Sequence, residues 1–313
     1  MYLKGNKMQK RDKNIELLKE RTLILTQTNP DGDMMFNAWL KEGLNADIIF
    51  KPKKKAIRFI RRFWVNNFIP GYSYWFGNWK KNLEKYDTVI VHADVRTRTV
   101  PAYIHHIKPE MRIIYWYWNP VNKNTSSELT RDNNIECWSF DENDCKKYNM
   151  KKNIQYYYEQ ILEYESKMQY DIYFVGHDKG RKNRIQEIEK QINELGMTGK
   201  FDLIEDEKKE ISYSEVQKRI EKSKAILEII QTGQVGCTLR ALEALFFRKK
   251  LITTNKNVVN EDFYNKNNIF IYGIDDIDNL PEFVNSAYDN NSDKFRYDHT
   301  IEAWLQNFFT RRD

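Results

Sequence analysis

The residues best suited to chemistry lie in one turn in the last third of the chain. Residues 223–255 read SKAILEIIQTGQVGCTLRALEALFFRKKLITTN, where an apolar run precedes a glycine-containing loop, a helical pattern and a second apolar run. A loop that opens a helix in this way exposes backbone N–H groups and the positive end of the helix dipole, which together bind phosphate. Gly233 and Gly236 allow a tight turn and a close approach of the backbone to a ligand.

Three side chains extend this phosphate-binding prediction. Thr238 is a typical N-cap, and Arg240 in the first helical turn can make a charge-assisted contact to phosphate. Glu243, one turn further along, can accept hydrogen bonds from both hydroxyls of a ribose. The alternative is an ordinary strand–helix joint, in which Arg240 and Glu243 form a surface pair at i, i+3. The chemistry of the residues leaves both interpretations open.

The elements that must position this turn follow an alternating pattern. Strand patterns in the first half lie at 22–27, 45–50, 87–93, 112–118 and 135–140. After a connector at 150–169, strand patterns return at 170–176, 200–206, 225–230, 250–255 and 268–273, with helices expected at 181–196, 212–224 and 238–247. Strands separated by helices predict parallel sheets covered on both faces. We expect an N-terminal lobe at 1–155, a C-terminal lobe at 156–295, and a final helix within 296–313 that packs back toward the first lobe.

Composition restricts the setting in which this chain works. Hydrophobic residues make up 41% of the sequence, enough for a substantial core. The three cysteines, Cys137, Cys145 and Cys237, have neither CxxC nor metal-type spacing, which favours reduced thiols in a cytosol. No apolar run approaches the roughly 18 residues of a membrane span, and the polar N-terminus has no signal-peptide core. We therefore expect a cytoplasmic protein.

The segment at 223–255 resembles the nucleotide-sugar half-site of GT-B-fold glycosyltransferases, in which a helix bearing a ribose-binding Glu precedes a strand. Further stretches, DIYFVGHDKGR, DFYNKNNIFIYG, IIYWYWNPV and WSFDENDCKKYN, are similar to bacterial transferases of lipopolysaccharide and capsular polysaccharide biosynthesis. The resemblance covers most of residues 87–275. It implies an α/β GT-B fold, with two Rossmann-like lobes that face each other across a cleft. It also implies transfer of a sugar from a nucleoside-diphosphate sugar, expected to be a UDP-sugar used without a metal, to a cell-envelope glycan or glycolipid.

The same resemblance implies a donor site in the second lobe. Lys179 and Arg181 would neutralise the diphosphate, and Tyr213 lies where such chains contact the base. The full expected set is Gly176, Lys179, Arg181, Tyr213, Gln234, Gly236, Thr238, Leu239, Arg240 and Glu243. Many retaining members of the superfamily carry a second Glu eight positions before the helix Glu. Here that position is Val235, so retaining and inverting chemistry both stay open.

Acceptor-side candidates follow the strand patterns of the first lobe. Asp31, in the loop TQTNPDGDMM, and Asp94, in VHADVRTR, are candidate bases for an acceptor hydroxyl, with His92 or a core role as alternatives. Asn119 and Asp141 end two further strands and are expected to line the acceptor side. Asp31 and Asp33 form a DxD triplet, but such triplets are common by chance and we expect no metal there.

A basic, aromatic segment stands apart from these motifs. Residues 51–62 carry no acid, and their positive excess is as large as the chain's whole net charge of +6. At 53–64 the spacing is helical, with Ile57, Ile60, Phe63 and Trp64 on one side. Residues 51–79 therefore predict contact with the inner membrane surface. The alternative is a helix whose apolar side packs in the core. Nucleic acid is a rival partner, but no nucleic-acid motif appears and we expect none to bind.

Three other functions fit parts of the pattern. A CDP-polyol phosphotransferase would use the same fold, and a non-catalytic glycosyltransferase-like scaffold or regulatory subunit would keep the fold without the chemistry. A basic nucleic-acid-binding protein would be recognised by tight, salt-dependent binding to DNA or RNA.

Overall fold

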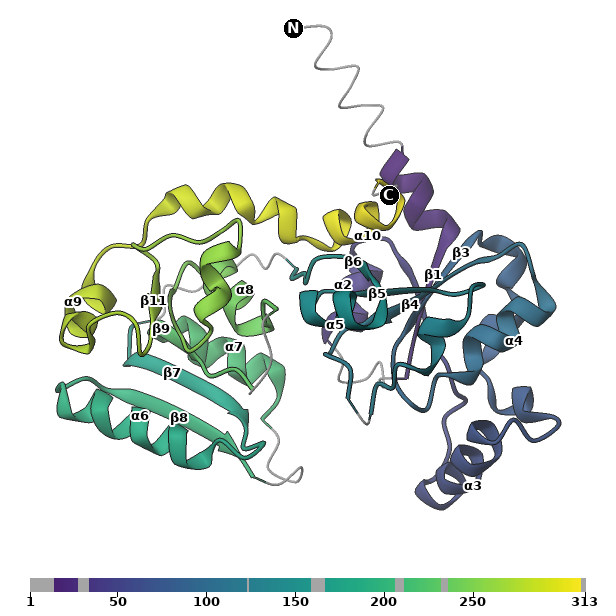
Figure 1. The fold of residues 1–313 in the computed structure, drawn as a ribbon, viewed down its shortest axis with the longest axis horizontal. Helices are drawn as coiled ribbons and strands as arrows, with labels where there is room; N and C mark the ends of the chain where they lie inside the picture. Colours follow the sequence, from purple (N-terminus) through teal and green to yellow (C-terminus); the bar gives the residue numbers. More distant parts are fainter. Residues whose placement is uncertain are drawn as a thin grey trace, which may run out of the picture. The chain divides into compact units, whose positions relative to one another are not determined.

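The structure is a computed structural model, and it describes residues 14–27, 34–122, 124–158, 167–205, 211–231 and 236–310. The chain divides into two compact units, each built around its own sheet (Figure 1). The first unit combines the chain up to Ile154 with the segment from Ile301 onward, and the second runs from Gln155 to Thr300.

The described part of the first unit holds a six-stranded, wholly parallel sheet in the order β2-β1-β3-β4-β5-β6. Its strands are β1 (Thr22–Thr26), β2 (Asn45–Ile48), β3 (Thr88–His92), β4 (Arg112–Tyr117), β5 (Glu136–Ser139) and β6 (Lys151–Lys152). Residues 14–21 are helical, and the further helices are α2 (Met34–Lys41), α3 (Lys55–Asn66), α4 (Thr99–Ile107), α5 (Glu142–Tyr148) and α10 (Ile301–Thr310). Short 3-10 helices lie at η1 (Tyr72–Trp75), η2 (Asn78–Lys81), η3 (Leu83–Lys85) and η4 (Glu128–Arg131).

Both faces of this sheet are buried, because alternate side chains of a strand point to opposite faces. One face, with Val89 and Ile113, packs on α4 through Val100 and Ile104. Side chains that point to the opposite face of the sheet contact α10. Trp116 of β4 and Trp138 of β5 contact Phe308 edge-on, with ring centroids 5.9 and 5.0 Å apart, and Trp116 also contacts Trp304.

Polar contacts also fasten α10 to the first unit. The Asn153 side chain donates to the Trp304 carbonyl at 3.1 Å, and Arg112 donates to the Phe308 carbonyl at 2.7 Å. Lys19, in the helical segment 14–21, forms a 2.6 Å ion pair with Glu302. The last described helix is therefore an integral layer of the unit in which the chain begins.

The described part of the second unit holds a five-stranded parallel sheet in the order β11-β10-β9-β7-β8. Its strands are β7 (Tyr170–His177), β8 (Gly199–Ile204), β9 (Ser223–Glu228), β10 (Lys250–Thr253) and β11 (Ile269–Ile271). Its α-helices are α6 (Lys182–Glu194), α7 (Tyr213–Glu221), α8 (Leu239–Phe246) and α9 (Leu280–Asn285). Its 3-10 helices are η6 (Lys256–Asn260), η7 (Ile277–Asn279), η8 (Asn290–Phe295) and η9 (Tyr297–His299). Helices α6 and α9 cover one face of the sheet, and α7 and α8 cover the other (Figure 1).

The two sheets repeat one topology. Counted from its first strand, each unit has the order 2-1-3-4-5, as β2-β1-β3-β4-β5 and as β8-β7-β9-β10-β11. The predicted α/β fold with two Rossmann-like lobes is confirmed. In such sheets ligands bind outside the carboxyl ends of the strands, at the point where the strand order reverses. The two switch points here are β1/β3 and β7/β9. Within the described ranges no helix has the length and apolar character needed to cross a membrane.

Candidate donor site in the second unit

The loop that follows β7 is shaped to return toward the sheet. Lys179 and Gly180 have φ angles of 46° and 78°, in the left-handed region. The left-handed backbone of Lys179 is held in place by hydrogen bonds between the residues on either side of it. The Asp178 carboxylate accepts from the Lys182 amide at 2.8 Å, and the Arg181 amide donates to the Asp178 carbonyl at 2.8 Å. The turn thus places two cations, Lys179 and Arg181, directly after the first strand of the switch point.

Arg181 links the ends of β7 and β9. Its guanidinium donates to the His177 carbonyl at 2.6 Å and also to the Ile229 carbonyl, on the far side of the switch point. Gly176 makes room for this arrangement, because a Cβ there would lie 3.2 Å from the Phe174 ring and 3.5 Å from Arg181 Nη2. The sequence-predicted Gly176 and Arg181 are therefore brought together in the structure.

Positive charge accumulates at this loop. Burial lowers the pKa of Arg181, and the charge of Asp178 only partly opposes that. The Lys179 side chain reaches solvent, but partial burial, and then the charge of Arg181, lower its pKa. A lysine whose pKa is lowered by a neighbouring arginine marks a place where an anion is favoured.

A buried carboxylate organises the start of α8. Glu228, the last residue of β9, is only 2% exposed. Its two oxygens accept from the hydroxyls of Thr238 and Thr253. Thr238 is also the predicted N-cap of α8, since its hydroxyl accepts from the Arg240 amide at 3.1 Å. Burial raises the pKa of Glu228, although the two hydroxyls lower it in part. Glu228 thus ties the N-terminus of α8 to the ends of β9 and β10.

Arg240 and Glu243 form the i, i+3 pair that the sequence allowed, but the pair is not a surface feature. The Glu243 side chain is fully buried and that of Arg240 is 22% exposed. One carboxylate oxygen of Glu243 accepts from Arg240, and the other accepts from the Tyr213 hydroxyl at 2.5 Å. Burial raises the pKa of Glu243, and the Arg240 charge opposes that rise.

This pair continues into a chain of tyrosines. The hydroxyls of Tyr213 and Tyr157 lie 2.8 Å apart. The Gln217 side-chain amide donates to Tyr157 at 3.1 Å and to Tyr158 at 3.2 Å, and the rings of Tyr157 and Tyr158 stack with centroids 4.7 Å apart. Tyr213 and Glu243 are therefore held in fixed positions by α7 and by the segment that enters the second unit.

The described members of the predicted donor site lie at three places in the second unit. Gly176, Lys179 and Arg181 lie at the end of β7. Tyr213 begins α7 and contacts the Glu243 carboxylate oxygen that Arg240 does not contact. Gly236, Thr238, Leu239, Arg240 and Glu243 lie at the start of α8. Gln234 and Val235 lie outside the described residues. Reasoning from sequence missed Glu228; the available signal was a single acid inside the apolar run AILEII.

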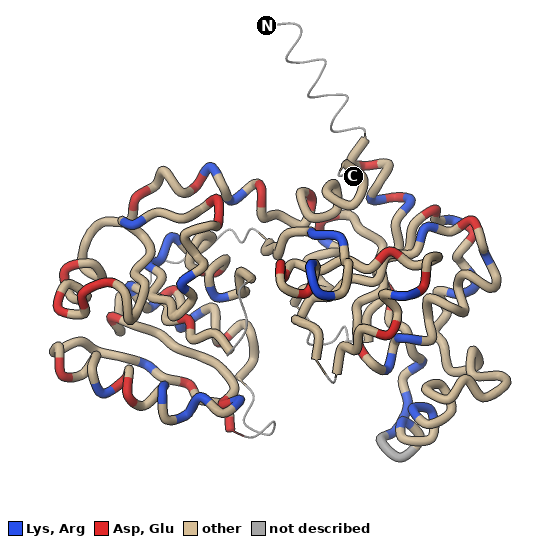
Figure 2. The backbone as a smooth tube through the Cα atoms, viewed as in Figure 1, with Lys and Arg blue, Asp and Glu red and all other residues tan. Residues whose placement is uncertain are grey.

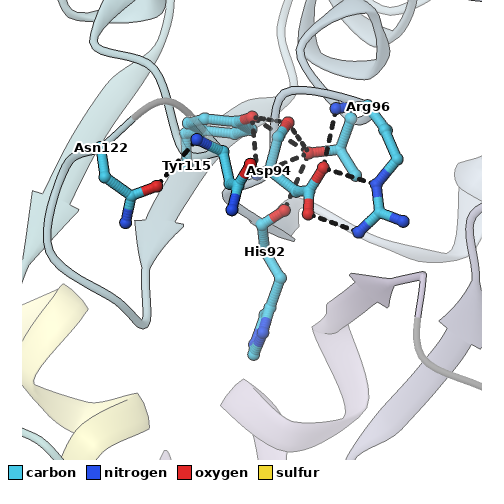
Figure 3. A network of polar contacts seen from close by, with 7 residues as sticks. His92, Asp94, Arg96, Tyr115 and Asn122 are labelled. Atoms are coloured by element: carbon cyan, nitrogen blue, oxygen red, sulfur yellow. Dashed lines mark hydrogen bonds and ion pairs between the residues drawn. The ribbon is translucent and has the colours of Figure 1, made fainter. Parts of the chain in front are cut away.

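The acceptor-side candidate Asp94 belongs to a closed polar network at the end of β3 (Figure 3). Arg96 donates twice to its carboxylate, at 2.8 and 2.7 Å. The Asp94 amide donates to the hydroxyls of Thr97 and Tyr115, both at 3.1 Å. Burial alone would raise the pKa of Asp94, but its hydrogen bonds with Arg96 outweigh burial and lower it. A carboxylate of lowered pKa is a weak general base.

His92 stands at the same strand end but points away from the Asp94 carboxylate (Figure 3). Its ring contacts Trp39 edge-on at 5.0 Å and stacks beside Trp118 at 6.2 Å. Burial lowers its pKa to about 4, so the ring is neutral at pH 7. Within the described part of the chain, its buried Nε2 has no hydrogen-bond partner.

The other acceptor-side candidates are dispersed. Asn119 is exposed beyond β4. Asp141 is buried and caps α5, accepting from the Asp144 amide at 3.1 Å. Asp31 and Asp33 lie outside the described residues. Across the residues that the structure does describe, no group of three or more His, Cys, Asp or Glu side chains is placed to hold a metal ion.

No protein-family model and no curated protein sequence matches this chain. Among solved structures, Alr3699/HepE of Anabaena in complex with UDP and glucose is similar, with a TM-score of 0.49, 9% sequence identity, and coverage of 92% of this chain and 97% of that chain. Its complex with UDP gives the same identity and TM-score and covers 94% of each chain. The chemistry of the site therefore has to follow from its own residues.

Proposed function

We propose that the second unit binds a nucleoside-diphosphate sugar and that the protein transfers the sugar to a glycan acceptor. One observation carries the proposal. At the β7/β9 switch point, the Arg181 guanidinium bridges the two strand ends, and in the same unit Thr238 caps α8, whose first turn carries Arg240. Cations and a capped helix N-terminus at a switch point suit a diphosphate.

The diphosphate is the leaving group of the proposed reaction. The bond between the sugar anomeric carbon and the diphosphate oxygen breaks, a new bond forms to an acceptor hydroxyl oxygen, and that hydroxyl loses its proton. Charge develops on the diphosphate as it leaves, and fixed cations stabilise such charge by a few kcal/mol. Because the Arg181 donors already serve backbone carbonyls, Arg181 contributes charge and shape. The exposed Lys179 is the residue we assign to direct phosphate contact.

Glu243 is the residue we assign to the ribose, and the structure adds a condition. Both of its oxygens are occupied, one by Arg240 and one by Tyr213. Because the Glu243 side chain is fully buried, we assign the place of the Tyr213 hydroxyl on Glu243 to a ribose hydroxyl, while Arg240 stays paired with the carboxylate. Replacement of Tyr213 by Phe should leave nucleotide affinity unchanged or improved, whereas a Tyr213 that contacts the base would lose affinity in the same variant.

The acceptor side of the proposal rests on the first unit. We assign the acceptor to the strand ends that carry Asp94 and Asn119, with Asp31 as the second candidate base. Asp94 can act as a base only if the acceptor displaces Arg96 from its carboxylate. A cell-envelope glycan as acceptor, and a UDP-sugar used without a metal, follow from the sequence resemblance.

Thermal stabilisation by nucleotides tests the donor site directly. The panel is UDP, GDP, CDP, ADP and dTDP, on the wild type and on Lys179→Ala, Glu243→Gln and Tyr213→Phe. We expect UDP to stabilise the wild type and Lys179→Ala to weaken UDP binding about tenfold. Lys190→Ala is the matched control, since Lys190 is an exposed lysine of α6.

The outcomes separate the candidate functions. Stabilisation by CDP alone would favour a polyol-phosphate transferase. UDP binding without release of UDP from UDP-sugars, with or without glycan acceptors, would favour a non-catalytic subunit. No stabilisation by any nucleotide would contradict the proposal.

A further inference from the structure

Helix α3 is amphipathic, and it is mounted with its apolar side outward. Among its residues whose side chains the structure describes, only Val65 is buried. Arg61, on the polar side, lies over the Phe50 ring at 4.5 Å and donates to the Lys51 carbonyl at 3.2 Å. The alternative in which the apolar side packs in the core is therefore wrong. Figure 1 shows α3 standing out from the sheet of its own unit.

The outward side is a continuous apolar surface. Phe59, Phe63 and Ile60 are 77%, 62% and 52% exposed, and Ile57 and Trp64 are exposed as well. At 3.6 residues per turn these five side chains share roughly half of the helix circumference. A surface of large apolar side chains at one place marks a binding face rather than ordinary scatter.

The charge around this surface has one sign. No acidic residue occurs between Asp47 and Glu84, and that interval holds nine lysines and arginines. Figure 2 shows the basic positions gathered along the α3 segment. Lys53, Lys54, Arg58 and Arg62 are all exposed. An apolar face with cations on the flanks complements the headgroup and acyl boundary of an anionic lipid layer.

We propose that α3 docks the protein onto an anionic phospholipid surface, with Phe59, Phe63 and Ile60 inserted among the acyl chains. Arg58 and Arg62 stay within a Debye length of the headgroups, which is about 10 Å at 0.1 M salt. This inference goes beyond the proposed transfer reaction and does not depend on it.

Charge and chemistry favour lipid over other occupants. A second copy of the chain would bring two such acid-free segments together, and their like charges repel. A nucleic acid that reached Arg58 and Arg62 would have to lay its charged backbone beside the exposed side chains of Phe59 and Phe63. A lipid layer meets both the apolar face and the charge.

The mounting of α3 suits it to dock without rearrangement. Arg98 donates to the Asn66 carbonyl at 3.0 Å, and Trp64 donates through its indole N–H to the Pro70 carbonyl at 3.1 Å. These contacts hold the C-terminal end of the helix, so its exposed face is presented in advance.

Cosedimentation of the full chain with vesicles tests the proposal and needs no donor or acceptor. The vesicles are pure phosphatidylcholine, or phosphatidylcholine with an equal amount of phosphatidylglycerol. We expect association with the anionic vesicles only, weakened by salt. Phe59→Ser with Phe63→Ser should weaken it about tenfold per phenylalanine, and Arg58→Glu with Arg62→Glu should nearly abolish it.

Matched controls keep the test specific. Ile107→Ser removes an exposed apolar side chain of α4, and Lys41→Glu with Lys85→Glu reverses two exposed charges elsewhere in the first unit. Both controls should bind as the wild type does. Absence of binding to anionic vesicles would overturn the proposal. The proposal would also be overturned if the double phenylalanine variant still bound anionic vesicles and duplex DNA displaced the wild type from them. It would likewise be overturned if that variant still bound the vesicles and differed from the wild type only in being a monomer where the wild type is a dimer.

Discussion

The two units share a strand order but use their switch points differently. At the β1/β3 end, Asp94 and Arg96 satisfy one another within a single loop. At the β7/β9 end, Arg181 instead spans two strand ends and has no carboxylate among its hydrogen-bond acceptors in the described residues. The same topology therefore carries a different balance of charge at its two switch points: a carboxylate pairs with the arginine in the first unit, whereas backbone carbonyls accept from the arginine in the second.

One histidine in each unit continues the contrast. His92 of the first unit is neutral, because burial lowers its pKa to about 4. His299 of the second unit lies 3.0 Å from an Asp262 carboxylate oxygen and 3.1 Å from the Gln155 carbonyl. Burial would lower the pKa of His299, but Asp262 outweighs it and raises that pKa. The pKa of a histidine is therefore lowered at position 92 in the first unit and raised at position 299 in the second.

The largest expected effect is a loss of stability that is confined to the first unit. Trp304→Ala removes a fully buried ring that packs on Trp116 and Phe308 of the first unit. Truncation of a core tryptophan costs about 4 kcal/mol of unfolding free energy. Calorimetry should show the loss in one transition, while stabilisation by UDP, a property we assign to the second unit, is kept. Loss of UDP binding as well would mean that the units do not fold independently.

A smaller effect compares two carboxylates that each organise the start of a helix. Glu228→Ala leaves the hydroxyls of Thr238 and Thr253 without their buried acceptor, and we expect a loss of about 2 kcal/mol. Asp141→Ala removes the cap of α5, and the loss of such a cap costs about 1 kcal/mol. Chemical denaturation measures both. Equal losses would show that Glu228 does no more than an ordinary cap.

The smallest effect is a pair of opposite pH trends. The folded pKa of His299 is raised, so its stabilisation is present below the unfolded pKa near 6.5 and is lost as pH rises through the folded value. The folded pKa of His92 is lowered to about 4, so its stabilisation is present above about 6.5 and is lost as pH falls toward 4.

Between pH 8 and pH 5.5 the first unit should therefore lose about 1 kcal/mol through His92, while the second gains through His299. Calorimetry of His92→Phe and His299→Gln should flatten one trend each. A trend that persists in its own variant would assign it to other groups.

The sequence predicted the elements well because both units bury their central strands on both faces. AILEII and KLITTN form β9 and β10, and TLRALEALFF forms α8, each ending within a few residues of its predicted limit. Thr238 also acts as the predicted cap. Local patterns suffice where local propensity, capping and burial all favour the same element.

The site was less predictable, because its residues are defined by long-range contacts. Glu228 gains its role from Thr253, and Glu243 from Tyr213, and neither partner is close in sequence. The outward mounting of α3 was equally hidden, since a helical period reports that two sides differ but not which side meets the protein. Only the contacts of Arg61 and Val65 decide that question.

The placement of α10 has a consequence for the order in which the protein can be made. The first unit lacks the rings of Trp304 and Phe308 until the ribosome has translated the whole of the second unit. Until then, Trp116 and Trp138 have no cover from that layer. A nascent or prematurely terminated chain that lacks α10 would thus carry an open apolar face that chaperones and proteases recognise, and the fold of the first unit is completed only after the second unit has been translated.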